Sequence, residues 1–270
     1  MTSRPKICRG FSVVLLLLSM KESSGQDLAV EVRPHAKTVA FGEPLIVTAV
    51  VVNNQPNTAV IIHHNAPLLR NAPSMVDLKL GTNRNDLRRW DARLGVDRRT
   101  EPSRLAAGEG GTIELVMLYS SRDGFFAIQP GTYWIQGRIV ADTGEVLSDP
   151  VPIEVREPSP EDKAAWEWIN AHKEEYGRLV QVPWEAKLSE EFRTGAEELC
   201  EKTPTVYTEY VAYFLSRWYR EGPGKERPDA LQQSDRFAEI ARAKATSDKL
   251  RAEAEKVLSA SQSKKPGEQD

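Results

Sequence analysis

The stretch 129–140, QPGTYWIQGRIV, constrains the fold of this chain more than any other stretch. Pro130 and Gly131 form a turn signal, and a run rich in β-branched and aromatic residues follows directly. Side chains alternate along a strand, so one face of this segment would carry Tyr133, Ile135, Gly137 and Ile139. The pattern predicts a strand with one face in a protein core.

The rest of the first half repeats this pattern of short apolar runs bounded by turn residues. We predict further strands at 28–32, 45–52, 58–62, 75–80, 112–119 and 146–155. Strands at short spacing, without a helical period between them, are typical of an antiparallel β-sandwich. A polar segment at 81–104 interrupts the series, and the number of strands within it stays open. This insert holds arginines at 84, 88, 89, 93, 98, 99 and 104.

Tyr133 stands two residues before the core position Ile135, which is the arrangement of the tyrosine corner in immunoglobulin-like sandwiches. Turn signals at 42–44 and 108–109 and the Asn-Asn pair at 53–54 complete the pattern. On these residues, the segment 26–156 resembles the immunoglobulin-like domains of exported bacterial proteins. The resemblance implies a sandwich that displays loops or edges to partners, and it brings no catalytic residues.

The chemistry changes at 157–160, EPSP, where Ser159 is a candidate N-cap and Pro160 suits the first helical position. Apolar residues then recur at helical spacing. We predict helices through 165–179, at 189–202, from 205 to the Gly-Pro-Gly at 222–224, and within 228–258. The helical subdomain is therefore 157–258, and 259–270 reads as a disordered tail.

The stretch 206–219, VYTEYVAYFLSRWY, resembles one helix of a tetratricopeptide-type hairpin, although no 34-residue repeat is found. This resemblance implies helical hairpins that bind peptides or another part of the same protein. The predicted fold class is therefore multi-domain, β then α: an immunoglobulin-like antiparallel β-sandwich plus C-terminal helical hairpins.

The N-terminus has the pattern of a signal peptide at 1–25. Three basic residues at 4, 6 and 9 precede an apolar run at 11–20, and small residues at 23 and 25 follow it. The run is about half of the ~20 residues that a membrane-spanning helix needs. We expect cleavage before Gln26, an extracytoplasmic (periplasmic or secreted) chain, and no stable membrane insertion; the alternative is a buried N-terminal strand or helix.

Candidate chemistry is sparse. The formal net charge of −3 does not favour nucleic acid as a partner. His63 and His64 could attract a metal ion, but neighbouring strand residues face opposite ways and no third ligand stands at a recognisable spacing. Cys200 lies on a predicted buried helix face, where thiols are usually inert. We therefore predict no catalytic residue, no metal ligand and no cofactor.

Five residues are candidates for binding a partner: Arg88, Arg89, Trp90, Trp166 and Tyr213. The arginines could hold an acidic partner or a polyanionic glycan, although interleaved acidic residues also favour pairing within a solvated loop. Trp166 and Tyr213 lie off the apolar stripes of their predicted helices. Each either packs between the two halves of the chain or anchors a partner, a role in which Trp and Tyr are enriched.

These observations predict an exported, non-enzymatic protein that recognises a protein or peptide. Two alternatives stay open. One is a proteinase-inhibitor-like protein that uses a sandwich loop, and the other is an enzyme whose site lies between the sandwich and the helices. A cleft with converging histidine or carboxylate side chains would favour the enzyme.

Overall fold

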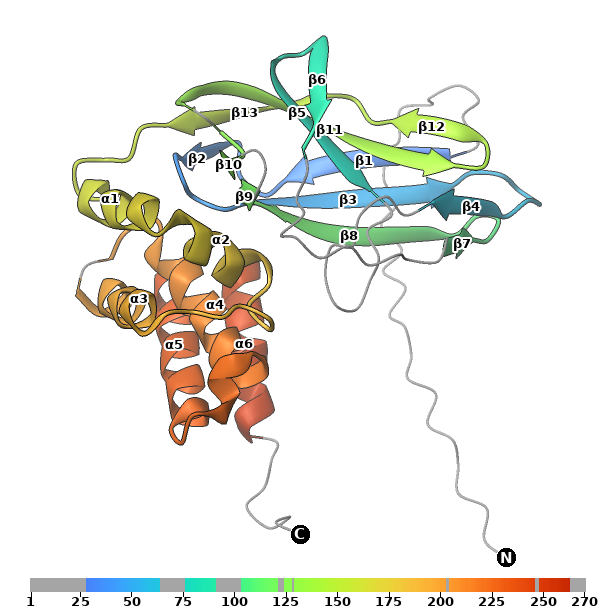
Figure 1. Cartoon of the computed structure of the whole chain (residues 1–270). Helices are drawn as coiled ribbons and strands as arrows, with labels where there is room; N and C mark the ends of the chain where they lie inside the picture. Colours follow the sequence, from blue (N-terminus) through green and yellow to red (C-terminus); the bar gives the residue numbers. More distant parts are fainter. Residues whose placement is uncertain are drawn as a thin grey trace, which may run out of the picture.

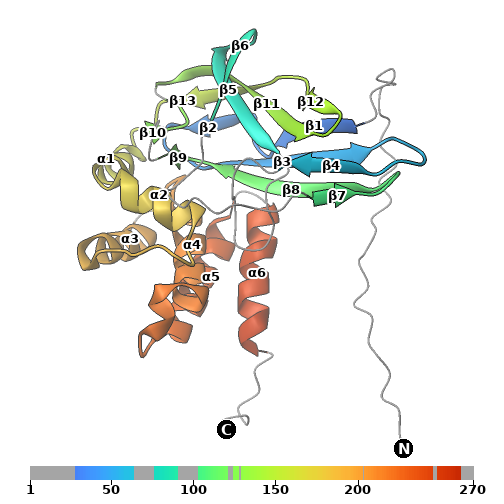
Figure 2. The ribbon, with the colours of Figure 1, turned by 45° about the vertical axis from the view of Figure 1, so that its right-hand side comes forward.

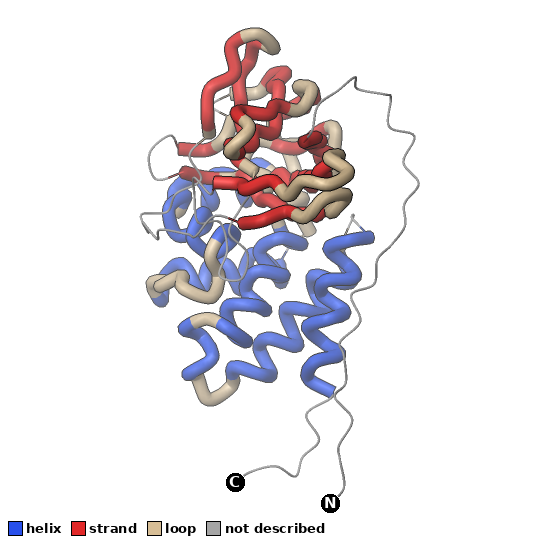
Figure 3. Tube along the Cα trace, turned by 90° about the vertical axis from the view of Figure 1, so that its right-hand side faces the viewer, coloured by secondary structure: helices blue, strands red, loops and turns tan. Residues whose placement is uncertain are grey.

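The computed structural model describes residues 28–63, 76–90, 103–120, 124–127, 129–202, 204–245 and 248–262. The predicted signal peptide lies outside these residues, so export stays a prediction. A β-sandwich forms the first half and a group of helices the second (Figure 1). The predicted order, β then α, is confirmed. In a side view the strands of the sandwich lie above the helices (Figure 3).

One sheet of the sandwich has the strand order β1-β3-β8, and both pairings are antiparallel. Its strands are β1 (Leu28–Pro34), β3 (Leu45–Asn53) and β8 (Gly110–Met117). In β3, every second residue is buried, from Leu45 through Val47, Ala49 and Val51. This strict alternation sends one face toward the other sheet, as the sequence predicts.

The other sheet is built around β11 (Gly131–Ala141), which is the strand predicted at 129–140. Its other strands are β2 (Thr38–Ala40), β4 (Val60–His63), β5 (Asp77–Asn83), β6 (Asp86–Arg89), β7 (Ser103–Leu105), β12 (Gly144–Leu147) and β13 (Val151–Arg156). A two-stranded piece pairs β9 (Tyr119–Ser120) with β10 (Gly124–Phe125). Gly137 lets the two sheets approach closely, because a Cβ there would lie 2.7 Å from Val32 Cγ1.

Three predictions about the strands need correction. The strand predicted at 146–155 is two strands, β12 and β13, because Pro150 lacks an N–H and Ser148 instead bonds with Gly137 in the gap. The sheet is not wholly antiparallel, since β2 pairs with β13 in parallel. The start of the arginine-rich insert is not a solvated loop: β6 folds back on β5 as a hairpin.

The tyrosine corner is confirmed. The ring of Tyr133 is buried in the sandwich core, and its hydroxyl donates a hydrogen bond of 2.9 Å to the carbonyl oxygen of Gln129. The bond ties the start of β11 to the turn that precedes it. Tyr133 therefore closes one end of the core while its hydroxyl keeps a partner.

Tyr133→Phe is expected to lower the free energy of unfolding by about 1 kcal/mol, because it removes this hydrogen bond and leaves the ring in place. Denaturant unfolding measures the effect. Tyr119→Phe, on β9 and packed in the helical core, is the control for the removal of the hydroxyl from a buried tyrosine. An unchanged midpoint for Tyr133→Phe would mean that its hydroxyl does not stabilise the turn.

The helices are α1 (Lys163–Ala171), α2 (Lys173–Gln181), α3 (Glu190–Lys202), α4 (Thr208–Glu221), α5 (Ala230–Lys244) and α6 (Asp248–Gln262), with a 3-10 turn, η1 (Pro223–Glu226). The predicted first helix is broken at His172, whose backbone leaves the helical region and whose ring Nδ1 lies 2.9 Å from the oxygen of Trp168. The predicted helix 228–258 is likewise two helices.

The boundary of the predicted tail is also wrong. Helix α6 continues to Gln262, four residues into the segment 259–270, because Ala254 and Val257 pack into the helical core and carry the helix on. Residues 263–270 lie outside the described part of the chain. In the described residues, no helix has the length and apolar content to cross a membrane.

Helix α4 is the centre of the helical half. The apolar stripe predicted for it is too narrow, since α4 buries residues around its whole circumference, Tyr213 among them. It packs against α2, α3, α5 and α6 (Figures 1 and 2). A helix that is covered on all sides buries apolar side chains on every face, which explains why α4 is rich in aromatic residues.

The sandwich and the helices meet closely at Trp166. Its ring centroid lies 4.8 Å from that of Phe41 and 5.3 Å from that of Phe125. Gly42 has a φ of 82°, and a Cβ there would lie 2.0 Å from Trp166 Cζ3, so the residue beneath the indole must be glycine. Leu118 and Tyr119, which follow β8, belong to the helical core. The two halves therefore share packed side chains.

Candidate functional site

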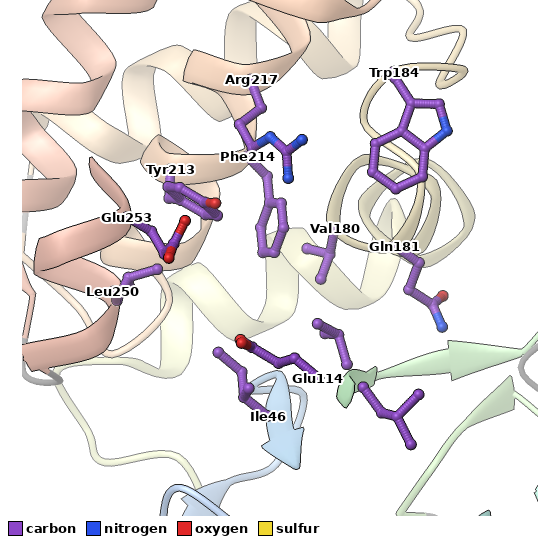
Figure 4. Close-up of a pocket in the computed structure, with 12 residues that line it drawn as sticks. Ile46, Glu114, Val180, Gln181, Trp184, Tyr213, Phe214, Arg217, Leu250 and Glu253 are labelled. Carbon is purple, nitrogen blue, oxygen red and sulfur yellow. The ribbon is translucent and has the colours of Figure 1, made fainter. Parts of the chain in front are cut away.

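A cleft opens where the sandwich lies over the helices (Figure 4). Its volume is about 240 Å³, and it lies between β3 and β8 on one side and α2, α4 and α6 on the other. Most of the side chains around it are apolar. The lining residues are Ile46, Glu114, Leu115, Val116, Val180, Gln181, Trp184, Tyr213, Phe214, Arg217, Leu250 and Glu253.

The sheet side of the cleft comes from residues that face away from the sandwich core. The neighbours of Ile46 in β3, Leu45 and Val47, are fully buried between the sheets, so Ile46 points to the outer face. In the register of the two strands, Ile46 lies directly opposite Val116. The outer face is therefore apolar at this end, where the helices cover it.

The helical side is formed mainly by consecutive aromatic residues of α4. The rings of Tyr213 and Phe214 are 5.0 Å apart in an edge-to-face arrangement, and both side chains are largely buried. Burial raises the pKa of the Tyr213 hydroxyl above its ordinary value. Tyr213 is therefore neutral at physiological pH, and its hydroxyl can donate a hydrogen bond.

Charged groups also line the cleft. The guanidinium of Arg217 lies 5.6 Å from the ring centroid of Trp184, a cation–π contact, and donates a 2.6 Å hydrogen bond to Glu221. Two carboxylates, Glu114 and Glu253, lie on the Tyr213 side (Figure 4). The Arg217 charge is matched by Glu221, and the Glu253 charge is matched by Lys256.

The most unusual group is the side-chain amide of Gln181, the last residue of α2. The residue is 7% exposed, and neither Oε1 nor Nε2 has a hydrogen-bond partner within the described part of the chain. A buried polar group without a partner costs about 1–3 kcal/mol. In the following turn, the N–H groups of Glu185 and Ala186 both donate to the oxygen of Val182.

A second polar group lies deeper between the two halves. Glu43 accepts a hydrogen bond of 2.8 Å from the backbone N–H of Ala40 and one of 3.1 Å from the hydroxyl of Tyr210. Burial, opposed by these two bonds, raises the pKa of Glu43 to about 7, and the nearby carboxylates of Glu209 and Asp162 raise it further. Glu43 joins a β-turn of the sandwich to α4.

The structure does not bring the five predicted partner-binding residues together. Tyr213 lines the cleft, whereas Trp166 packs between the two halves. Arg88 and Arg89 lie on β6, at the side of the sandwich away from the helices (Figure 1). Arg89 pairs with Asp77 at 3.1 Å, and Arg88, 85% exposed, lies 3.9 Å from Asp86.

Trp90 is not an exposed anchor. It is 8% exposed and belongs to the core of the sandwich, directly after the last residue of β6. The remaining arginines predicted for the insert, apart from Arg84 and Arg104, lie outside the described residues. The partner-binding prediction for Arg88, Arg89 and Trp90 therefore loses Trp90, and the two arginines are held near acidic neighbours.

The candidate metal and thiol residues that the structure describes do not come together. His63 ends β4, and His64 lies outside the described part of the chain. Within the described residues, no group of three or more His, Cys, Asp or Glu side chains is placed to hold a metal ion. Cys200 is buried, and burial raises the pKa of its thiol, which keeps it protonated.

Sequence patterns did not identify most of the cleft. Gln181, Arg217, Glu114 and Glu253 read as ordinary polar positions. One signal was available, because the alternation of β3 and β8 leaves the apolar side chains of Ile46 and Val116 on an outward face. Two such residues, opposite each other, indicate a face that another element covers.

No protein-family model and no curated protein matches this chain. Spo0M, a sporulation control protein from Bacillus subtilis, is 17% identical over 54% of this chain and 56% of its own, with a TM-score of 0.31. A CARDB domain from Pyrococcus furiosus is 13% identical over 48% of this chain and 88% of its own, with a TM-score of 0.28. The C-terminal domain of wzt is 10% identical over 50% and 77%, with a TM-score of 0.31. Such low scores carry no argument about function.

Proposed function

We propose that this chain is an exported, non-enzymatic binding protein that recognises a protein or peptide partner through the cleft between the sandwich and the helices. The partner inserts an apolar side chain of about the size of Leu or Phe. The observation that carries the proposal is a cleft of about 240 Å³ that is lined mostly by apolar side chains. The aromatic rings of Tyr213 and Phe214 are two of them.

The size of the cleft supports this occupant. An apolar cavity of about 150 Å³ is large enough to hold benzene, so the cleft has room for one large side chain. Arg217 and Glu253 at its wall are paired with Glu221 and Lys256, so an uncharged apolar side chain meets no unmatched charge from these two residues. The resemblance of α4 to a tetratricopeptide-type helix is compatible with peptide binding and stays part of the proposal.

The test uses the capped peptide acetyl-Lys-Leu-Ala-Leu-Lys-amide and calorimetry or backbone NMR shifts. Val116→Phe puts a phenyl ring in place of a smaller side chain in the cleft. Binding is expected to weaken at least tenfold, because the peptide side chain loses its space. Ile61→Phe makes a similar change on an exposed residue of β4, away from the cleft, and should bind as the unaltered chain does. Absence of binding to the unaltered chain, or equal binding by Val116→Phe, would contradict the proposal.

Export rests on the basic and apolar pattern at 1–25. We expect N-terminal sequencing of the native protein to find a chain that begins near Gln26. An intact Met1 on the protein recovered from the cytoplasm would contradict export without affecting the cleft.

A further inference from the structure

A second concave surface lies on the side of the sandwich away from the helices, where the β5–β6 hairpin rises from its sheet (Figures 1 and 2). We call it the hairpin groove; its volume is about 670 Å³. Lys79 of β5 and Gln136 of β11 line it and lie opposite each other in the strand register. Both point outward, because their neighbours Leu78 and Ile135 are buried in the core.

The β5–β6 hairpin forms one wall of this groove and is held in place by its own backbone. A Cβ at Gly81 would lie 2.5 Å from the carbonyl oxygen of Asp86, so a glycine is needed where the hairpin folds back. At the tip, the N–H of Asn85 donates a 3.0 Å hydrogen bond to Asn83 Oδ1. The polar side chains of the tip are therefore presented at the groove by a fixed turn.

Two cations in the groove are not matched by an acidic residue. Within the described part of the chain, neither Lys79 nor Arg84 has an ion-pair partner. The guanidinium of Arg84 lies 5.4 Å from the ring centroid of Trp134, a cation–π contact. A guanidinium that rests on an aromatic ring keeps the N–H groups at its edge for a ligand. Arg84 is thus oriented without being neutralised.

The arginines next to the groove are already paired. Asp77 accepts hydrogen bonds from Arg89 at 3.1 Å and from Arg138 at 3.0 Å. Asp86, which also lines the groove, lies 3.9 Å from Arg88. The described charged residues that line the groove are thus two cations and one carboxylate, a net charge of +1. This excess suits a ligand with one carboxylate at a time and not a dense polyanion such as nucleic acid.

The other residues that line the groove match a sugar. The side-chain amides of Asn85 and Gln136 both donate and accept hydrogen bonds, as sugar hydroxyl groups do. The amide of Gln136 is anchored, because its Nε2 donates a 2.8 Å hydrogen bond to the oxygen of Ser148. Leu147, which is 40% exposed, and Pro150 offer apolar surface to the C–H groups of a sugar ring. A fatty acid would leave the two amides unused.

We propose that the hairpin groove binds an acidic oligosaccharide, with one uronic acid unit held by Arg84 and Lys79. The planar carboxylate accepts paired hydrogen bonds from the guanidinium, the amides bind hydroxyl groups, and the apolar wall covers the ring. This inference goes beyond the proposed function, because the residues that line the groove and those that line the cleft are entirely different.

The test measures binding of trigalacturonate and of the neutral trisaccharide maltotriose to the full chain by calorimetry or backbone NMR shifts. The unaltered chain is expected to bind trigalacturonate about tenfold more tightly, because hydrogen bonds to a charged group are stronger than those to a neutral one. Arg84→Gln should remove this preference. Arg104→Gln, at an exposed position on β7 outside the groove, removes the same charge from the chain and should keep the preference.

Three results would overturn the acidic-sugar site. They are no binding of trigalacturonate, equal binding of the two trisaccharides, and an equal loss of affinity in Arg84→Gln and Arg104→Gln. Tighter, Arg84-dependent binding of the peptide acetyl-Glu-Gly-Glu-Gly-Glu-amide would also overturn it, in favour of an acidic protein partner. Arg84→Gln should still bind acetyl-Lys-Leu-Ala-Leu-Lys-amide, so failure of the groove and failure of the cleft are separate results.

Discussion

Glu43→Gln is expected to raise the free energy of unfolding by about 3 kcal/mol at pH 8 and by little at pH 4. The pKa of Glu43 is about 7 in the folded chain, against an ordinary value of 4.5. Below pH 4.5 the carboxyl is protonated in both the folded and the unfolded states. As the pH rises toward 7, the unfolded state ionises first, so the stability of the native chain falls. Gln imitates the protonated acid and does not ionise.

Denaturant unfolding at pH 4, 6 and 8 measures this effect. The pH dependence that disappears should be that of the Glu43 carboxyl alone. The groups that face this carboxyl are Tyr210, Glu209, Asp162 and the N–H of Ala40. Glu255→Gln, on an exposed position of α6, is the matched control and should leave the pH dependence as it is. A stability difference for Glu43→Gln that is the same at pH 4 and pH 8 would contradict the raised pKa.

Trp166→Ala is expected to lower the free energy of unfolding by about 3 kcal/mol and to uncouple the unfolding of the two halves. The indole fills the space between Phe41, Phe125 and the backbone at Gly42, and it stacks on Tyr207, whose hydroxyl donates a 2.7 Å hydrogen bond to the oxygen of Phe41. Removal of the indole leaves a cavity at the place where sandwich and helices share their packing.

Hydrogen exchange followed by mass spectrometry can measure the stability of 28–156 and 157–262 separately. Trp134→Ala is the control, because Trp134 lies on β11 beside Arg84 and outside this contact. It should lower stability without separating the two segments. The folded Trp166→Ala chain should still bind the capped leucine peptide. A normal, cooperative unfolding transition with lost peptide binding would instead make Trp166 an anchor for the partner.

The features that could be predicted from sequence are those that depend on neighbouring residues. The alternation of β3 specifies which of its faces is buried, whatever packs there. The two residues of the tyrosine corner, Gln129 and Tyr133, are only four positions apart, so its hydrogen bond forms wherever the turn and strand form. Helices α3 and α4 likewise begin and end close to their predicted positions, because Ser189 Oγ accepts from the N–H of Phe192 at the start of α3 and Gly222 ends α4.

The positions at which predicted strands and helices are divided could not be found without the tertiary structure. The break between β12 and β13 depends on Ser148 finding Gly137 across the sheet. The break at His172 separates α1 from α2. Helix α1 places Trp166 against the sandwich, whereas α2 places Val180 and Gln181 at the cleft. Continuation of α6 to Gln262 depends on the core of the helical half, into which Ala254 and Val257 of α6 pack against other helices.

The candidate site depended on tertiary structure almost entirely. Glu43 belongs to a Gly-Glu-Pro turn, and nothing in that turn shows that Tyr210, 167 positions later, buries its carboxyl. Gln181 is a polar residue at a helix end, and its missing partners follow only from what packs around it. Local sequence therefore determined the strands, most helices and the buried faces, because these follow from side-chain periodicity. The packing of helices on the outer face of β3 and β8 decided which polar groups lost water, and so which residues form the cleft.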